Sequence, residues 1–135
     1  MVKALEVEIS AFLNQYLEIF ITFDADQIAA WYCVPTIAMG FDGSINCFQS
    51  REEITWFFQR VADIYQGEGA ISGTMHDLEV VPIGGRSALA TVTWKNRRPD
   101  GSVARQFRMS YNVVRFDEGW RILAATVHLS AALGQ

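Results

Sequence analysis

The sequence has few of the residues that mark secreted, metal-binding or nucleic-acid-binding proteins. Its 135 residues include two cysteines, Cys33 and Cys47, which form neither a CxxC pair nor a zinc-ligand spacing. We therefore expect free thiols and no metal site. The net charge is −4, whereas surfaces that bind nucleic acids are basic, so no nucleic-acid partner is expected.

Long apolar runs and cofactor motifs are also missing. No run approaches the roughly 20 residues that cross a bilayer, and the first residues lead into an amphipathic pattern without the features of a signal peptide. We therefore expect no membrane association and a cytoplasmic location. The chain lacks a GxGxxG after a strand, a P-loop, an HExxH and a GxSxG, so no metal or nucleotide cofactor is indicated.

The chain does contain enough apolar residues for one core. Half of its residues are hydrophobic and 19% are charged, which predicts a single globular domain over residues 1–135. Apolar residues recur every three or four positions from Leu5 to Phe23 and predict a long first helix. Either Asp24 or Asp26 is expected to cap a second helix over residues 26–33, which Pro35 ends.

A third helix is predicted over residues 50–66, where Ser50 and Glu53 form a capping box. Its expected inward residues are Ile54, Phe57, Phe58, Val61, Ile64 and Tyr65. A short hairpin over residues 36–48 precedes this helix. Strands over residues 70–81 and 87–95 and a long hairpin over residues 105–130 follow it. Three helices and a mostly antiparallel meander predict an α+β fold.

Successive strand residues point to opposite sides, so the first strand of the long hairpin has two different faces. One face is polar at one end and apolar at the other, and the second face is apolar until Arg115. A three-residue loop at Pro99-Asp100-Gly101 would place Ala88 opposite Asn112 and Ala90 opposite Ser110. We expect this face, with Asn112 and Arg108, to look into a pocket beneath the helices. The apolar face of Phe107, Met109, Tyr111 and Val113 is then expected outside, where a second subunit would cover it.

Three segments carry a family resemblance: QYLEIFITFDADQIAAWY, SREEITWFF and YNVVRFDEGWRI. Together with the order of elements, they resemble the nuclear transport factor 2-like superfamily across nearly the whole chain, and within it the ketosteroid isomerases. The resemblance implies a cone, in which a strongly curved sheet wraps around three helices and encloses an apolar pocket. It also implies a homodimer formed through the outer sheet face.

The resemblance to ketosteroid isomerases also suggests site residues. The oxyanion tyrosine of that family falls on Tyr16 and a supporting tyrosine on Tyr32. The oxyanion acid falls on Asn112, whose amide can still donate a hydrogen bond, and a further tyrosine falls on Phe58. The catalytic base falls on Met39, whose thioether accepts no proton. The chain is therefore not expected to be a ketosteroid isomerase.

The leading hypothesis is a homodimeric protein that binds a small apolar molecule bearing a carbonyl or hydroxyl group. Isomerase, cyclase or dehydratase chemistry by general acid-base catalysis follows from the resemblance. Tyr16 and Asn112 are the candidate catalytic residues, and a structural alternative ties the Tyr16 hydroxyl to Tyr32. The candidate ligand-binding residues are Tyr32, Met39, Phe58, Trp94, Arg108 and Phe20.

The alternative hypothesis is a non-catalytic dimerisation or association module that uses the apolar face of the long hairpin. The histidines, His76 and His128, are suited to proton transfer near neutral pH. A satisfied or exposed histidine is the alternative for each, and the sequence leaves open whether either faces the pocket.

Overall fold

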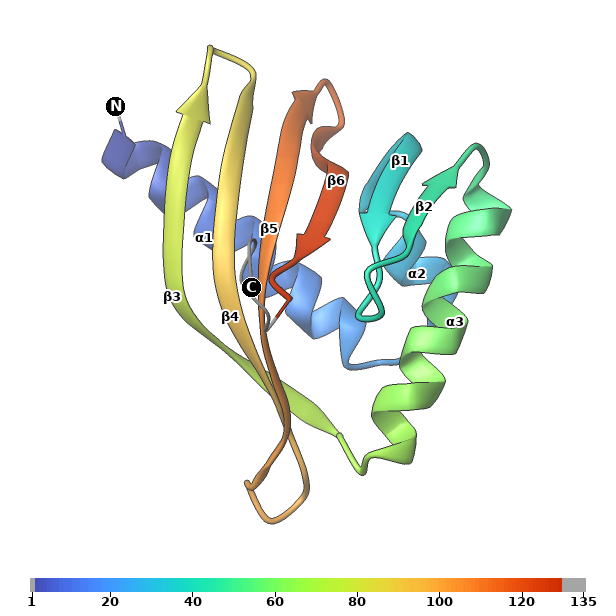
Figure 1. Cartoon of the computed structure of the whole chain (residues 1–135). Coiled ribbons are helices and arrows are strands. Elements are labelled where there is room, and N and C mark those ends of the chain that lie inside the picture. Colours follow the sequence, from blue (N-terminus) through green and yellow to red (C-terminus); the bar gives the residue numbers. More distant parts are fainter. Residues whose placement is uncertain (1, 130–135) are drawn as a thin grey trace, which may run out of the picture.

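The structure is a computed structural model that describes residues 2–129. Its elements are α1 (Val2–Phe20), α2 (Ala25–Ala29), β1 (Tyr32–Met39), β2 (Ile45–Phe48), α3 (Arg51–Gly67), β3 (Ser72–Ile83), β4 (Ser87–Arg97), β5 (Val103–Phe116) and β6 (Gly119–Val127). The strands form one sheet in the order β2-β1-β6-β5-β4-β3 (Figure 1). β1 and β6 run parallel, and every other neighbouring pair is antiparallel. The predicted α+β class is confirmed.

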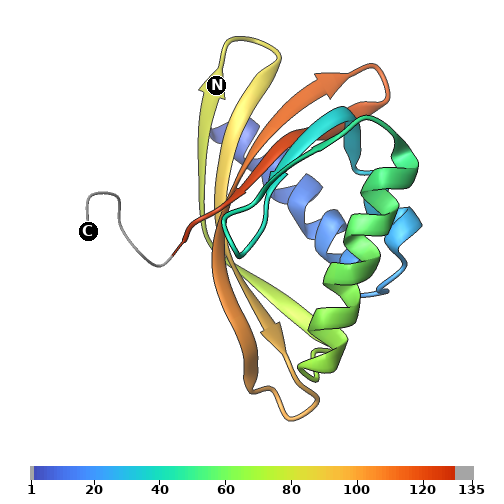
Figure 2. The same ribbon diagram turned by 45° about the vertical axis from the view of Figure 1, so that its right-hand side comes forward.

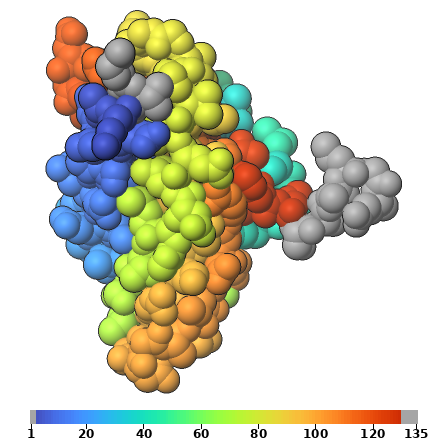
Figure 3. Space-filling model, turned by 90° about the vertical axis from the view of Figure 1, so that its left-hand side faces the viewer, coloured from blue at the N-terminus to red at the C-terminus, as the bar shows by residue number. Residues whose placement is uncertain are grey.

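The sheet curves strongly, and the helices lie on its concave side (Figure 2). α1 runs alongside β3 at one margin of the sheet (Figure 3). The core between the helices and the sheet contains the fully buried side chains of Ile9, Leu13, Ile28, Ile54 and Ile122. No helix among residues 2–129 is long and apolar enough to cross a membrane.

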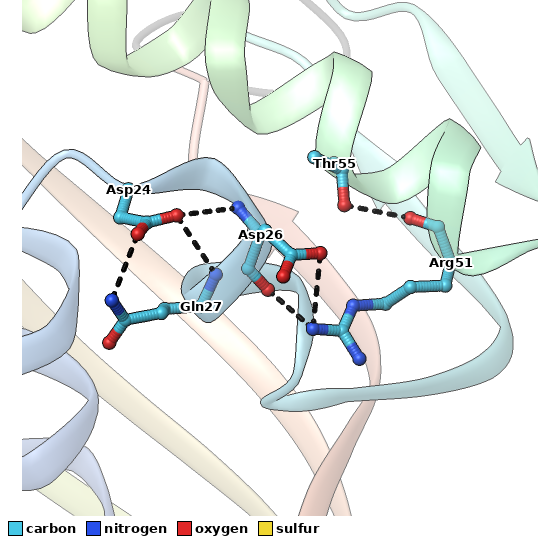
Figure 4. Close-up of polar contacts among 5 residues, drawn as sticks. All are labelled: Asp24, Asp26, Gln27, Arg51 and Thr55. Atoms are coloured by element: carbon cyan, nitrogen blue, oxygen red, sulfur yellow. Dashed lines mark hydrogen bonds and ion pairs between the residues drawn. The ribbon is translucent and has the colours of Figure 1, made fainter.

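The short helix α2 is capped by Asp24 and tied to α3 by Arg51 (Figure 4). The Asp24 carboxylate accepts hydrogen bonds from the amides of Asp26 and Gln27, at 3.2 and 3.4 Å. The Arg51 guanidinium donates to the Asp26 carbonyl oxygen at 2.7 Å and lies 3.3 Å from its carboxylate. The start of α3 is thereby fixed against α2.

The predicted second helix is too long, because α2 ends at Ala29 and β1 already begins at Tyr32. Tyr32 pairs with Ile122 of β6, and the Trp31 carbonyl accepts from the Ile122 amide at 2.9 Å. Pro35 therefore lies inside a strand and does not end a helix. Pairing with β2 and β6 outweighs the weak helical pattern of the segment.

The predicted start of α3 is confirmed, since the Ser50 hydroxyl accepts from the Glu53 amide at 3.2 Å. In a capping box the Glu53 carboxylate would accept from the Ser50 amide, but here it accepts from the Gln49 amide at 2.6 Å. α3 buries Ile54, Phe58, Ala62 and Tyr65. The expectation that Ile64 points inward is wrong, because its side chain is 49% exposed.

The expected register between β4 and β5 is wrong by one residue. Arg98 and Ser102 do face each other across the turn, but the pairing shifts between Asn96 and Arg97. A shift of one residue exchanges the two faces of a strand. Tyr111, not Ser110, therefore lies opposite Ala90.

This shift reverses the faces expected for β5. Phe107, Met109, Tyr111 and Val113 pack in or against the core on the concave side. The association surface expected from these four residues is therefore inside the protein. The convex face instead carries Arg108, Ser110 and Asn112.

Replacing the capping residue of α3 tests this account of the helix start. We expect Ser50→Ala to lower the free energy of unfolding by about 1 kcal/mol, because the amide of Glu53 loses its acceptor. Ser50→Asp retains an acceptor and should unfold near the wild-type urea concentration. If both variants lost the same free energy of unfolding, the side-chain oxygen would not cap the helix.

Candidate ligand cavity

A cavity of about 410 Å³ lies between the concave face of the sheet and helices α1 and α3. This volume falls within the 300–1,000 Å³ range that is typical of small-molecule sites. Aromatic side chains make up much of the wall. They include Tyr16, Phe20, Tyr32, Phe58, Tyr65, Trp94, Phe107 and Tyr111.

Two hydrogen-bonded pairs supply polar groups inside this wall. The hydroxyls of Tyr16 and Tyr32 lie 2.5 Å apart, and Trp94 Nε1 donates to the Tyr111 hydroxyl at 2.8 Å. The Tyr16 ring contacts Tyr32 and Tyr111 edge to face, with ring centroids 6.0 and 6.1 Å apart. Among the described residues, the Tyr111 proton and one proton of the Tyr16–Tyr32 pair have no acceptor.

Burial keeps these hydroxyls protonated. Loss of solvent contact is the main cause that raises the pKa of Tyr16 and Tyr32 well above the ordinary value, and neighbouring tyrosines add to the rise. Burial likewise raises the pKa of Tyr65 and Tyr111. The tyrosines of the cavity are therefore hydrogen-bond donors and not bases near neutral pH.

The charged residues among the described lining residues are Asp42, Arg60 and Lys95. Asp42 is the one carboxylate among the lining residues that the structure describes, and it is exposed in the turn between β1 and β2. Hydrogen bonds from Ser44 lower the Asp42 pKa, which makes this carboxylate a weak base. Arg60, also exposed, lines the wall from α3.

An ion pair lies beside the cavity, near the end of α3. Arg105 donates to the Glu68 carboxylate at 3.0 and 2.5 Å and stacks over Phe41, with its guanidinium carbon 4.5 Å from the ring centroid. The hydrogen bond with Arg105 is the main cause that lowers the Glu68 pKa and raises that of Arg105. The charge of Arg105 is thus already balanced.

Most of the site residues expected from the sequence come together in this cavity. Its lining includes Tyr16, Phe20, Tyr32, Met39, Phe58 and Trp94. The Tyr16–Tyr32 bond also matches the structural alternative for Tyr16. Side chains from two helices, α1 and α3, and two strands, β1 and β4, thus converge on one space.

The placement expected for Asn112 and Arg108 is wrong, because the bulge at Asn96 and Arg97 turns both side chains to the convex face. Asn112 Nδ2 donates to Ser87 Oγ at 2.8 Å and to the Ala88 carbonyl at 3.2 Å. Arg108 donates to Thr93 Oγ1 at 2.9 Å, to the Asp77 carbonyl at 3.1 Å and to the Glu79 carboxylate. Both side chains have their partners within the chain.

The histidines also lie away from the cavity. His76 Nε2 is 2.8 Å from Thr74 Oγ1, and His128 Nε2 is 2.8 Å from Ser110 Oγ. Neither histidine is among the lining residues. The sequence left open whether either histidine faces the pocket, and in the structure neither does.

Sequence reasoning did not assign many of the lining residues to the site, among them Tyr65, Asn96, Phe107 and Tyr111. Phe107 and Tyr111 were assigned to the opposite face. The composition of β5 carries the signal that could have found them, because a strand normally turns its more apolar face to the core. Asn96 stands in a polar run before the turn, and the sequence offers no comparable signal for it.

Residues 6–130 match the family described as NTF2-like protein (DUF6841). The chain belongs to this family. No curated protein matches the chain in sequence.

Solved structures share the NTF2-like fold at low identity. A proposed dehydratase from Streptomyces avermitilis is 11% identical, with a TM-score of 0.73 over 98% of this chain and 100% of that one. A cystatin-like domain of unknown function from Nostoc punctiforme is 22% identical, with a TM-score of 0.70 over 95% of this chain and 78% of that one. A proposed calcium/calmodulin-dependent protein kinase II association domain from Xanthomonas campestris is 16% identical, with a TM-score of 0.69 over 92% and 88%. At these identities the likeness establishes the fold alone.

A pH titration tests the burial of the tyrosines of this NTF2-like chain. All four line the cavity and have raised pKa values, so ionisation of these groups opposes folding. Their contribution to stability is complete below the unfolded-state pKa of about 10 and is lost as the pH rises above it. We expect tyrosinate absorbance to appear only together with unfolding above about pH 10. Ionisation of any tyrosine near pH 10 in the folded protein would contradict this burial.

Proposed function

We propose that this protein binds a small apolar molecule and holds its carbonyl or hydroxyl oxygen with the tyrosine hydroxyls of the cavity. The observation that carries the proposal is an aromatic cavity that contains hydroxyl protons without acceptors. An apolar ligand would exchange water for aromatic surface. An acceptor on this ligand would take the unpaired proton of the Tyr16–Tyr32 pair.

The polar contacts favour binding over proton abstraction. A carbonyl that accepts a tyrosine hydrogen bond is polarised, which is the activation that an isomerase, cyclase or dehydratase would need. Such an enzyme also needs a base within hydrogen-bond reach of the proton that it removes. The carboxylate that the described lining offers is Asp42, which is exposed and a weak base. Binding is therefore the proposed function, and acid-base turnover is the second candidate.

Matched probes test the proposed contact. Fluorenone and fluorene share one rigid frame and differ in a single carbonyl group. In calorimetric titrations, we expect the double variant Tyr16→Phe/Tyr32→Phe to bind fluorenone about 3- to 10-fold more weakly than the wild type and to bind fluorene equally well. Removing both partners of the hydroxyl pair leaves no orphaned group, so stability should change little.

A matched control tests whether the loss of affinity is specific to substitutions inside the cavity. Asn112→Ala removes a polar side chain outside the cavity and should leave the affinity for both probes unchanged. The proposed contact would be contradicted if neither probe bound the wild type. It would also be contradicted if the double variant bound fluorenone as tightly as the wild type does.

We also propose that the convex face pairs with a second copy of the chain. Paired residues form a mostly apolar row across the sheet: Val81, Leu89, Asn112, Ala124 and Ile37. Val81 is 55% exposed, Leu89 37% and Ile37 47%. An exposed row of this kind, apolar except for Asn112, is typical of an interaction surface, and an isologous dimer would bury it in both copies.

A charge in the middle of this row tests the dimer. We expect light scattering after gel filtration to show a dimer for the wild type at micromolar concentration and a monomer for Leu89→Glu. The control Val7→Glu alters an apolar residue on α1 that is 67% exposed, and it should remain dimeric. A monomeric wild type would show that the row does not mediate self-association.

A further inference from the structure

The hydroxyl of Tyr65 differs from the other three tyrosine hydroxyls of the cavity. Those of Tyr16 and Tyr32 bond to each other, and that of Tyr111 accepts from Trp94. Among the described residues the Tyr65 hydroxyl has no hydrogen-bond partner, although the residue is only 6% exposed. A nearly buried polar group without a partner is rare, because burial removes its bonds to water.

The Tyr65 oxygen is not sealed inside the protein. Among residues 2–129, the side-chain nitrogen or oxygen that is both fully enclosed and unpaired is Asn96 Nδ2. The Tyr65 oxygen is unpaired but not fully enclosed, so part of its surface remains accessible. Because Tyr65 lines the cavity and is almost wholly buried, this accessible surface belongs to the cavity wall.

Ring contacts connect Tyr65 to the buried end of the cavity and to its exposed part. The Tyr65 ring packs against Phe20, with centroids 5.7 Å apart, and Phe20 in turn packs against Tyr16 at 5.6 Å. Tyr65 also packs against Phe107 at 6.0 Å, and Phe107 contacts Phe41, which is 40% exposed. Tyr65 therefore lies, in this series of contacts, between the buried Tyr16 and the exposed part of the lining.

The hydroxyls of Tyr65, Tyr16 and Tyr32 face a common space. Burial is the main cause that raises the pKa of Tyr16 and Tyr32, and the charge of Tyr65 adds to the rise in both. Such an effect requires groups that lie close together. The Tyr65 hydroxyl is thus near enough to the other two for one small molecule to reach them all, yet it bonds to neither.

The charges near Tyr65 favour an uncharged ligand oxygen. Burial is the main cause that raises the pKa of Tyr65, so its hydroxyl is a hydrogen-bond donor near neutral pH. Arg105 and Glu68 shift this pKa in opposite directions, and the two side chains bind each other. An anion at Tyr65 would lose its hydration beside a cation that is already paired, whereas a hydroxyl or carbonyl oxygen needs only a donor.

We propose that the ligand of this cavity carries a second, uncharged oxygen, which accepts a hydrogen bond from the Tyr65 hydroxyl. The ligand class is thus an apolar molecule with one oxygen at the Tyr16–Tyr32 pair and a hydroxyl or carbonyl oxygen at Tyr65. This inference rests on the proposed function, because the first oxygen is the one held by that pair. Tyr65 then determines which apolar carbonyl compounds bind most tightly.

Hydroxylated ketones test the second contact at different spacings. One series compares fluorene, fluorenone and the 2- and 4-hydroxy derivatives of fluorenone, and the other compares biphenyl, 4-acetylbiphenyl and 4-acetyl-4′-hydroxybiphenyl. In calorimetric titrations, we expect at least one hydroxyketone to bind the wild type about 3- to 10-fold more tightly than its parent ketone. Tyr65→Phe should abolish this gain and leave the affinity for the parent ketone unchanged. The control Asn112→Ala, outside the cavity, should retain the gain.

A stability measurement without ligand distinguishes this role from a structural one. The Tyr65 hydroxyl has no partner within the described chain, so we expect Tyr65→Phe to leave the melting temperature unchanged or slightly higher. The matched control Tyr111→Phe should lower the melting temperature by at least about 3 °C, because Trp94 Nε1 loses its acceptor. If Tyr65→Phe lowered the melting temperature as much as Tyr111→Phe does, the Tyr65 hydroxyl would be paired within the protein and the proposal would be overturned.

The two proposals fail in different ways. Parent ketones that bind no better than their hydrocarbons would contradict the contact with the Tyr16–Tyr32 pair, and the inference about Tyr65 would fall with it. Parent ketones that bind preferentially, with no further gain from a hydroxyl group in either series, would overturn the Tyr65 inference alone. A gain that persists in Tyr65→Phe would overturn it as well.

Discussion

The bulge between Asn96 and Arg97 decides which face of β5 lies against the helices. Beyond this point each residue of β5 pairs one position away from where an unbroken ladder would place it. Tyr111 and Phe107 therefore enter the cavity, whereas Arg108 and Asn112 lie outside. The aromatic character of the cavity and the polar network of the convex face both follow from this one extra residue.

The cavity exists because small residues lie on the concave face of the sheet and large aromatic residues surround them. Ala38 and Ala125 are buried on the sheet and line the cavity, where larger aliphatic side chains would fill the space. Rigid aromatic rings from α1, α3 and β5 enclose what remains. Close packing normally leaves few voids, so a space of this size among the described residues agrees with the proposed ligand site.

Much of the fold follows from the sequence because it depends on local patterns. The stripe on α1 and the capping residue Ser50 are local, and the inward position of Tyr16, Phe20 and Phe58 followed from the helical patterns. The assignment of Tyr16 and Phe58 to a site came from the resemblance to the ketosteroid isomerases. The end of α2 was not predictable, since Trp31 and Tyr32 suit a helix until β6 pairs with them. The face of β5 was mispredicted because the register was counted from the turn without the bulge between Asn96 and Arg97, although the more apolar face of the strand favours the core side.

The central claim is that a tyrosine hydroxyl in the cavity donates a hydrogen bond to a ligand carbonyl. The infrared stretching band of fluorenone labelled with carbon-13 at its carbonyl measures this contact directly, because the band moves to lower frequency when the oxygen accepts a hydrogen bond. We predict a band for the wild-type complex below that of fluorenone in an apolar solvent, and a return towards the solvent value in Tyr16→Phe/Tyr32→Phe. A bound band at the apolar-solvent frequency in the wild type would contradict the account.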